Sequence, residues 1–208
     1  MQPFIPPARP LIGEEEIDAV AAVMRTGMIA QGPQVAAFEE EFAATLVPGT
    51  YAVAVNSGTS ALHLGLLAAG IGPGDEVIVP SFTFAATANS VAITGATPVF
   101  ADIDPLTFTL SPAAVEAAIT PRTRAIMPVH LYGHPAPMEA LQAIADAHGL
   151  MVFEDAAQAH GATLHGRAVG SFGTFAAFSF YPTKNMTSGE GGMVTSTDPS
   201  VIRGVKLA

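Results

Sequence analysis

Lysine is rare in this chain, and one of its two lysines stands in a segment suited to chemistry. Lys184 follows an apolar run and the residues SFYPT, and the other lysine is Lys206. Asp155 closes a second apolar run. If both runs are strands of an open α/β sheet, the amine and the carboxylate lie where such sheets bind ligands. A partly desolvated lysine can attack an aldehyde, and a carboxylate can keep a heterocyclic ring nitrogen protonated. Lys184 and Asp155 therefore predict Schiff-base catalysis with pyridoxal 5′-phosphate.

A phosphate needs an anion site, and residues 56–61 (NSGTSA) offer one. This segment follows an expected strand and opens an expected helix. Gly58 lets the backbone approach a ligand, and free amides at a helix start join the hydroxyls of Thr59 and Ser60. An ordinary strand-to-helix turn with a capping serine explains the same residues, and it is favoured if the segment is taken alone. The nucleoside-triphosphate pattern GxxxxGK followed by Ser or Thr is absent.

Three further side chains are candidates for contacts with a flat heterocycle. Gln158 could hydrogen-bond the phenolic oxygen of the cofactor, Phe84 could cover its ring, and Ser179 could add a phosphate contact. Each has a plain alternative, namely a surface amide, an apolar core contact and a buried hydroxyl satisfied by the backbone. For Asp155 the alternative is a helix cap, and for His160 it is a hydrogen-bonded structural histidine.

Other polar residues are assigned no chemistry. His130 and His134 are interpreted as structural, and Glu190 among its glycines as part of a turn. Asp102 and Asp104 lack the spacing and surroundings of a metal site and indicate a turn after a strand. The sequence predicts no metal site.

Hydrophobic periodicity predicts the elements that position these residues. We expect strands at residues 51–56, 76–80, 97–101, 125–130, 150–154, 174–180 and 192–196. We expect helices at residues 14–25, 33–46, 60–69, 85–94, 112–119 and 138–148. Their alternation predicts an α/β fold of three layers, with a mainly parallel sheet of seven strands covered on both faces. The last strand follows glycines without an intervening helix, so we expect it to be antiparallel.

Composition restricts the class of protein. Half of the residues are hydrophobic, 12% are charged, and the net charge is −10. An acidic surface disfavours nucleic acid and acidic membranes as partners. Cysteine is absent, which excludes disulfides and thiolate metal sites. No basic region followed by an apolar run opens the chain, and the apolar run at 61–71 is too short to span a bilayer. We expect a cytoplasmic protein.

Seven blocks of sequence carry a family resemblance. In chain order they are ARPLIGEEEIDAV, QGPQVAAFEEEFA, NSGTSALHL, GDEVIVPSFTFAATANSV, PVHLYGHP, FEDAAQAHGA and SFYPTKNMTSGEGGMV. They resemble the pyridoxal-phosphate-dependent sugar aminotransferases of the DegT/DnrJ/StrS family, within fold type I of the aspartate aminotransferase superfamily. The resemblance covers nearly the whole chain.

The resemblance implies a role for each candidate residue. Lys184 is the lysine that binds the cofactor, Asp155 is the partner of the pyridine nitrogen, and Gln158 lies near the phenolic oxygen. The remaining implied contacts are Phe84 stacked on the ring and Gly58, Thr59 and Ser179 on the phosphate. One subgroup of the family carries histidine in place of the lysine and performs deoxygenation, so the lysine favours transamination.

The resemblance also shapes the expected domain organisation. We expect residues 1–30 to form an N-terminal arm and a first helix, and residues 31–208 to form the cofactor-binding large domain. Relatives carry a tryptophan or similar aromatic near Met28, so the substrate edge differs there. Relatives also continue beyond Ala208 into a small C-terminal domain that is absent from this chain. We expect either a fragment or a protein without that domain, ending at the linking helix.

Two hypotheses follow. The first is an aminotransferase that moves an amino group, from glutamate by resemblance, to a keto sugar carried on a nucleotide, and that works as a homodimer. The second is a domain that binds pyridoxal phosphate without turnover, as a regulator or an inactive fragment. The lysine and the aspartate favour the first hypothesis, and the missing C-terminal half favours the second.

Overall fold

The computed structural model describes residues 4–6 and 8–208, so residues 1–3 and 7 of the predicted N-terminal arm lie outside the described residues. Its centre is a sheet of seven strands in the order β1-β9-β8-β5-β4-β2-β3. The strands are β1 (Tyr51–Val55), β2 (Glu76–Pro80), β3 (Thr97–Ala101), β4 (Thr123–Ile126), β5 (Met151–Asp155), β8 (Phe175–Ser179) and β9 (Gly192–Ser196).

Six of these strands run in one direction, and β9 runs in the other. It is antiparallel to both of its neighbours, β1 and β8, whereas the pairs from β8 to β3 are all parallel. The mainly parallel sheet and its antiparallel last strand, both predicted from the sequence, are confirmed. The carboxyl ends of β2, β4, β5 and β8 therefore share one edge, and the loops that follow them meet there.

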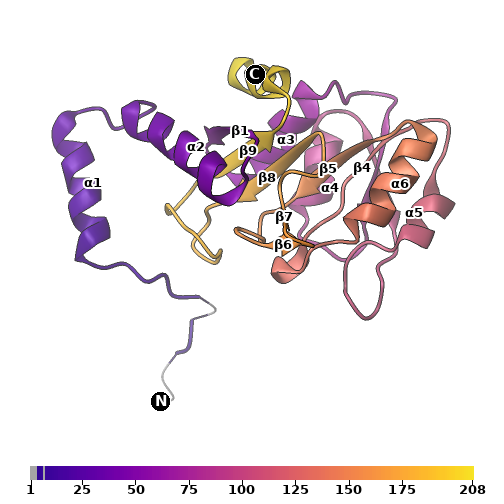
Figure 1. The fold of residues 1–208 in the computed structure, drawn as a ribbon, viewed down its shortest axis with the longest axis horizontal. Coiled ribbons are helices and arrows are strands. Elements are labelled where there is room, and N and C mark those ends of the chain that lie inside the picture. Colours follow the sequence, from indigo (N-terminus) through magenta and orange to yellow (C-terminus); the bar gives the residue numbers. More distant parts are fainter. Residues whose placement is uncertain (1–3, 7) are drawn as a thin grey trace.

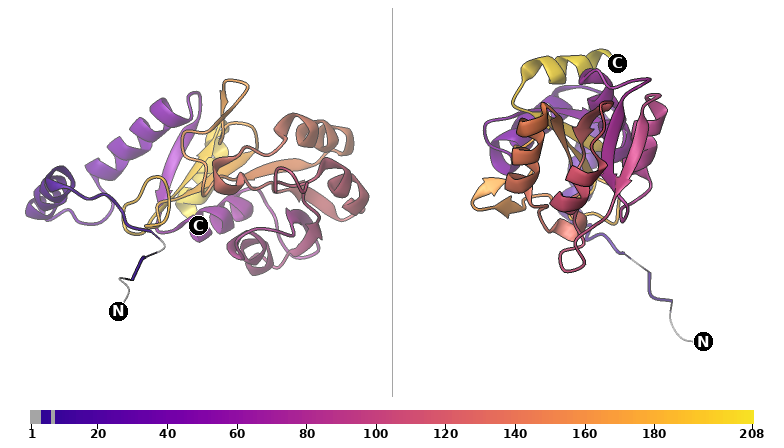
Figure 2. Two further views of the ribbon diagram at one scale, coloured as in Figure 1. Left: turned by 90° about the horizontal axis from the view of Figure 1, so that it is seen from below. Right: turned by 90° about the vertical axis from the view of Figure 1, so that its right-hand side faces the viewer.

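Helices cover both faces of the sheet (Figure 1, Figure 2). One face packs against α3 (Gly58–Ala68), α4 (Ala86–Ile93) and α7 (Pro199–Leu207). The other face packs against α2 (Pro33–Leu46), α5 (Pro112–Ala118) and α6 (Met138–His148). This is the three-layer α/β/α arrangement that the alternation of strands and helices predicts.

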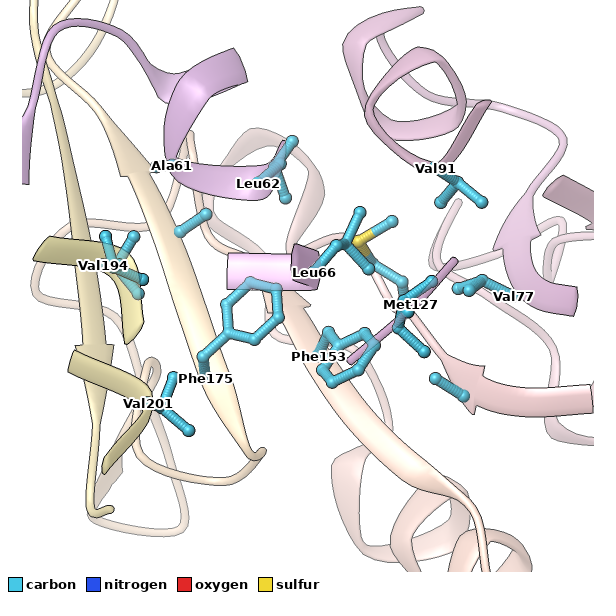
Figure 3. Packing of buried hydrophobic residues seen from close by; sticks show 14 of the residues in the cluster. Ala61, Leu62, Leu66, Val77, Val91, Met127, Phe153, Phe175, Val194 and Val201 are labelled. Atoms are coloured by element: carbon cyan, nitrogen blue, oxygen red, sulfur yellow. The ribbon is translucent and has the colours of Figure 1, made fainter. Parts of the chain in front are cut away.

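The strands carry apolar side chains on both faces because both are covered. Along β2, Val77 and Val79 belong to the cluster under α3, whereas Ile78 points into the cluster under α5 and α6. Figure 3 shows the first cluster, where Phe153 and Phe175 of adjacent strands lie close to Leu66 of α3. The two phenyl rings stack with centroids 4.6 Å apart. Full burial of a phenylalanine side chain contributes roughly 1.5–3 kcal/mol to the free energy of unfolding. This apolar cluster therefore helps to hold the ends of β5 and β8 in place.

Helix α1 (Glu14–Thr26) differs from the others because none of its residues is buried. Gly13 caps its N-terminus, and the Gly13 N–H donates to the Glu16 carboxylate at 2.7 Å. Gly27, in the left-handed conformation, caps its C-terminus. Figures 1 and 2 show α1 and the preceding segment projecting from the body that contains the sheet. Its apolar residues Ile17, Val20 and Met24 are exposed.

The structure differs from the predicted elements in two places. Strand β4 ends at Ile126, before the predicted residue 130, and only an isolated bridge from Val129 to Asp155 follows. Pro128 has no N–H to continue a ladder. A short hairpin, β6 (Thr163–Leu164) and β7 (Arg167–Ala168), was not predicted. His165 and Gly166 both have positive φ at its turn, as a type I′ turn requires.

No helix within the described part of the chain is both long and apolar enough to cross a membrane.

Candidate active site

A cavity of about 450 Å³ opens at the edge where the parallel strands end. Its walls come from the loops after β1, β2, β5 and β8, segments far apart in the sequence. The predicted site residues that line it are Gly58, Thr59, Phe84, Asp155, Gln158, Ser179 and Lys184. Among the residues predicted to contact the cofactor, only Ser60 is not part of this wall, so the fold brings the others together.

Ser57 and Gly58 form the start of α3 at this edge. The cap of the helix is Ser57, whose hydroxyl accepts the N–H of Ser60 at 3.0 Å, so the cap is one turn earlier than the sequence indicates. A Cβ added to Gly58 would lie 2.6 Å from the Cβ of Ser179. Glycine is therefore required for the helix start to approach the end of β8. The N–H groups of this first turn have no partner inside the helix and point toward the cavity end of α3.

Asp155 is a buried carboxylate with few hydrogen bonds. Its Oδ2 accepts from the Thr87 hydroxyl at 2.7 Å, and its Oδ1 accepts from the Ala157 N–H at 3.2 Å. Burial raises the pKa of Asp155 above its usual value, and the Thr87 hydroxyl, the Ala157 amide and the charge of Lys184 lower it. The described residues that directly follow Asp155 form turns and then the strand Thr163–Leu164, with no helix starting there, so the helix-cap interpretation is wrong.

Lys184 lies in the loop between β8 and β9 and is half-buried. Its backbone N–H donates to the carbonyl of Tyr181 at 2.9 Å, which closes a turn of this loop. The charge of the Lys184 ammonium lowers the pKa of Asp155 and also that of His160, so the amine lies near both. An amine between a buried acid and an anion-binding helix start is suited to hold an anionic carbonyl compound.

Gln158 is oriented by the backbone of Tyr132. The N–H of Tyr132 donates to Oε1 of Gln158 at 2.6 Å. Because an N–H can only donate, the amide oxygen faces Tyr132 and the NH₂ group remains available for the cavity. Tyr132 has a left-handed backbone with φ 54°, which is unusual for a bulky residue. The sequence did not lead us to predict Tyr132 as the partner of Gln158. The feature that could have indicated it is the segment LYG, in which Tyr132 is followed by glycine.

Phe84 is not a core residue. Its side chain is 71% exposed although it lines the cavity. The alternative of an apolar core contact is therefore wrong. Ser179, in contrast, is buried, and its hydroxyl accepts the N–H of Tyr181 at 3.4 Å. An exposed ring above a cavity is available to cover a flat ligand.

The histidines next to the site have structural surroundings. Nδ1 of buried His130 accepts the N–H of Ala136 at 3.0 Å, so the proton is on Nε2, which contacts Oε2 of Glu154 at 3.1 Å. His160 packs against the rings of Phe178 and Phe180, with centroids 5.4 and 5.6 Å away. Within the described residues neither ring nitrogen of His160 has a close hydrogen-bond partner, although an interaction with the Ser179 backbone raises the pKa of the ring. The hydrogen-bonded histidine therefore stays a prediction. Burial lowers its pKa to about 4, so this imidazole is neutral.

Asp104 and Asp102 form turns, as predicted. Oδ1 of Asp104 accepts the N–H groups of Leu106 and Thr107 at 2.8 and 3.0 Å. Asp102 accepts the N–H of Ile103 at 2.8 Å. Within residues 4–6 and 8–208 no group of three or more His, Asp or Glu side chains could hold a metal ion.

Several residues at the site were not singled out from the sequence. The wall of the cavity also includes Ser57, Leu62, Thr83, Tyr181 and Thr183, and it includes Glu190, which the sequence assigned only to a turn. Thr87 contacts Asp155 from behind the wall. Thr87 is in the first turn of α4, whereas Thr83 lies in the loop before that helix, so helical spacing does not explain their contact.

The arrangement fits a flat, anionic heterocycle with a carbonyl group and a basic ring nitrogen. The helix start accepts the anion, Lys184 offers an amine, Phe84 offers a ring face, and buried Asp155 offers a negative charge. A cationic ring nitrogen beside Asp155 would offset the desolvation of its carboxylate.

Comparison with known proteins agrees with this arrangement. Residues 10–207 match the DegT/DnrJ/EryC1/StrS aminotransferase family. The spore coat polysaccharide biosynthesis protein SpsC of Bacillus subtilis (strain 168) is 52% identical over 204 residues, which are 98% of this chain and 52% of SpsC. The dTDP-3-amino-3,4,6-trideoxy-alpha-D-glucose transaminase of Streptomyces venezuelae is 53% identical over 190 residues, 91% of this chain and 50% of that enzyme.

A solved structure shares the fold as well. The structure of S. venezuelae DesV in complex with a ketimine intermediate has a TM-score of 0.89 and 52% identity, and the match covers 93% of this chain and 52% of DesV. The chain thus spans about half the length of the curated relatives it matches. The match over residues 10–207 shows that the chain belongs to the DegT/DnrJ/EryC1/StrS aminotransferase family.

Proposed function

We propose that this chain forms the pyridoxal-phosphate site of a sugar aminotransferase, with Lys184 and Asp155 as its catalytic residues. The observation that carries the proposal is a single cavity that joins the half-buried lysine, the buried aspartate and the start of α3. Membership of an aminotransferase family supports the same activity.

The residues present suit this cofactor. Lys184 would bind its aldehyde, and Asp155 would face the ring nitrogen. Gly58, Thr59 and Ser179 would hold the phosphate at the helix start, where the close approach to Ser179 leaves no room for a side chain on residue 58. The free NH₂ of Gln158 would donate to the phenolic oxygen, which is an acceptor.

Pyridoxal phosphate supplies, when bound, an electron sink for negative charge at the α-carbon of an amino donor. The chain contributes the proton transfers and the orientation. Once the amino donor has displaced it from the cofactor, Nζ of Lys184 would take the α-proton of the donor and would return it to the cofactor carbon that carried the aldehyde oxygen. The Asp155 carboxylate would hold a proton on the ring nitrogen, and its burial would keep water from competing for that contact.

The substrates proposed are a keto sugar carried on a nucleotide and, as amino donor, glutamate. The first is supported by the dTDP-sugar transaminase among the relatives and the second by the family resemblance.

We also propose that the protein works as a homodimer in which α1 and the segment before it contact the second copy. The observation behind this is the group of exposed apolar side chains Phe4, Ile5, Leu11, Ile12, Ile17, Val20, Met24, Met28 and Ile29. Large apolar side chains that are exposed along one segment in this number are typical of an interaction site. Residues 31–208 would then form the cofactor-binding domain and residues 1–30 the arm.

Borohydride trapping tests the assignment of the lysine. The chain supplied with pyridoxal phosphate should turn yellow, and reduction should attach the cofactor to Lys184. Lys184→Ala should remove the label, and Lys206→Ala, the matched control in the only other lysine, should keep it. A label on Lys206, or no label on the unaltered chain, would exclude the proposed site.

A further inference from the structure

A buried hydroxyl on α4 contacts the carboxylate of the site. Thr87 is fully buried, and its Oγ1 donates to Oδ2 of Asp155 at 2.7 Å. The two residues are 68 positions apart in the sequence and meet because α4 packs beside the end of β5. This short contact is one of the two hydrogen bonds that the described residues make to the Asp155 carboxylate, the other being the Ala157 N–H at 3.2 Å.

The hydroxyl of Thr87 is itself held in one direction. Its Oγ1 lies 2.8 Å from Oγ1 of Thr83, and either hydroxyl could donate. An ionised carboxylate only accepts, so the single proton of Thr87 points to Asp155. Thr83 must then donate to Thr87, which gives a directed chain of hydroxyls from Thr83 through Thr87 to Asp155. Hydrogen bonds in such a chain strengthen one another.

Because Asp155 is buried, the charge of its carboxylate depends on this series of hydroxyl groups. The aspartate is 5% exposed, so water does not replace a missing donor. Burial raises the pKa of Asp155, and the Thr87 hydroxyl is the largest of the effects that lower it, ahead of Ala157. The charge of Lys184, in the loop after β8, also lowers it, and His130, in the segment after β4, is the other titratable group near Asp155.

We propose that Thr87 is a positioning residue that keeps Asp155 ionised and turned toward the cavity, with Thr83 orienting the Thr87 hydroxyl. The inference rests on the proposed function, in which an ionised Asp155 faces the ring nitrogen of the cofactor. Thr83, Phe84 and Thr87 lie in the same short segment at the start of α4. One segment thereby sets both the aromatic cover of the cavity and the charge of its acid.

The test uses variants that remove the donor without changing the shape. Thr87→Val keeps the volume and loses the hydroxyl, and Thr87→Ser keeps the hydroxyl. Ser90→Ala is the matched control, because Ser90 is buried on the same helix and donates only to the Thr87 carbonyl at 2.9 Å. The first readout is the free energy of unfolding of the cofactor-free chain as a function of pH.

Without its donor, Asp155 should protonate at higher pH, since the hydroxyl stabilises only the ionised form. Thr87→Val should therefore lose more stability at neutral pH than at acid pH. Thr87→Ser and Ser90→Ala should lose nothing that depends on pH. In an Asp155→Asn background the pH-dependent difference between Thr and Val at position 87 should vanish. If the difference persists there, Thr87 does not act through Asp155 and the proposal is wrong.

The second readout separates this inference from the proposed function. Thr87→Val should still be labelled at Lys184 by borohydride, while the rate with an amino donor falls about tenfold to a hundredfold, the scale of one hydrogen bond to a charged group. Thr87→Ser should restore most of the rate. Equal rates for Val and Ser would refute the role of Thr87, whereas an unlabelled wild-type chain would refute the proposed function.

Thr83→Val provides the test if Thr87→Val does not fold. It leaves the hydrogen bond to Asp155 in place and removes only the hydroxyl that orients it. The pH-dependent loss should then have the same sign and a smaller size. A Thr83→Val chain with wild-type pH dependence would contradict the directed chain of hydroxyls.

Discussion

The start of helix α3 touches the end of strand β8 through Gly58 and Ser179. A Cβ on residue 58 would lie 2.6 Å from the Cβ of Ser179 and 3.0 Å from its Oγ, closer than side-chain atoms approach. This contact brings the N–H groups of a helix start next to a buried hydroxyl, which is the geometry of an anion site. The proposed phosphate site thus depends on two segments about 120 residues apart in the chain.

Gly58→Ala should therefore abolish cofactor binding with only a moderate loss of stability. The added methyl group forces α3 away from β8, which opens the proposed phosphate site, and overpacking of this kind costs about 1–3 kcal/mol. Titration with pyridoxal phosphate and chemical unfolding would measure the two effects. Gly72→Ala is the control, because nothing lies within 4 Å of a Cβ added there. Wild-type affinity in Gly58→Ala would argue against a phosphate at this helix.

Asp155→Asn should stabilise the cofactor-free chain at neutral pH. Burial raises the pKa of Asp155 in the folded state, so the unfolded chain releases its proton first as the pH rises. Stability then falls as the pH increases from the ordinary aspartate range up to the folded-state pKa. The amide removes this fall. Unfolding curves between acid and neutral pH should show a flatter profile for the variant, and an unchanged profile would contradict the prediction.

The same substitution should disable the chemistry. An amide does not hold a proton on a ring nitrogen as a carboxylate does, and a loss of ~4 kcal/mol of stabilisation corresponds to about a thousandfold in rate. A single-turnover assay with an amino donor on the whole enzyme measures the effect. Retention of the label at Lys184 would show that the cofactor still binds. A near-normal rate would remove Asp155 from the proposed mechanism.

His160 should make the fold sensitive to acid. Burial lowers the pKa of His160 from 6.5 to about 4, so the imidazole ring is neutral in the folded state. The contribution of His160 to stability is fully present above pH 6.5, the pKa of histidine in the unfolded chain. It is lost as the pH falls from 6.5 toward 4. His160→Phe keeps an aromatic ring beside Phe178 and Phe180 and should flatten this part of the profile. An equally steep profile in the variant would place the acid sensitivity elsewhere.

Glu154→Gln should destabilise the fold strongly. Oε1 of Glu154 accepts the N–H groups of Phe172 and Gly173 at 2.7 and 2.8 Å, and Oε2 accepts that of Gly170 at 2.8 Å. In glutamine an NH₂ group replaces one of these two oxygens, and it cannot accept a hydrogen bond from the N–H groups that face it. We therefore expect chemical unfolding to show a free energy of unfolding lower by about 2–4 kcal/mol. Glu139→Gln is the control. Its exposed contact with His165 should contribute little, and equal losses in both variants would refute the role of Glu154.

The sequence by itself determined the order of strands and helices and most of the candidate site. Lys184, Asp155 and Gly58 could be found because each lies at or within a few residues after the end of a run of apolar residues, and strand ends in an open parallel sheet converge on one edge. The antiparallel last strand was predictable from the glycines that precede it. The spacing of hydrophobic residues and the residue types in turns are local properties, so they can be identified from the sequence alone.

The tertiary structure decided the partners of these residues. Thr87 meets Asp155, Tyr132 meets Gln158, and Glu154 gathers the amides of the loop after β7, all across different elements. It also assigned the cap of α3 to Ser57, exposed Phe84, and buried His160 between phenyl rings. Such contacts depend on the order of strands in the sheet and on how closely helices pack on it. Hydrogen bonds and burial are set by neighbours in space, which local sequence patterns do not specify.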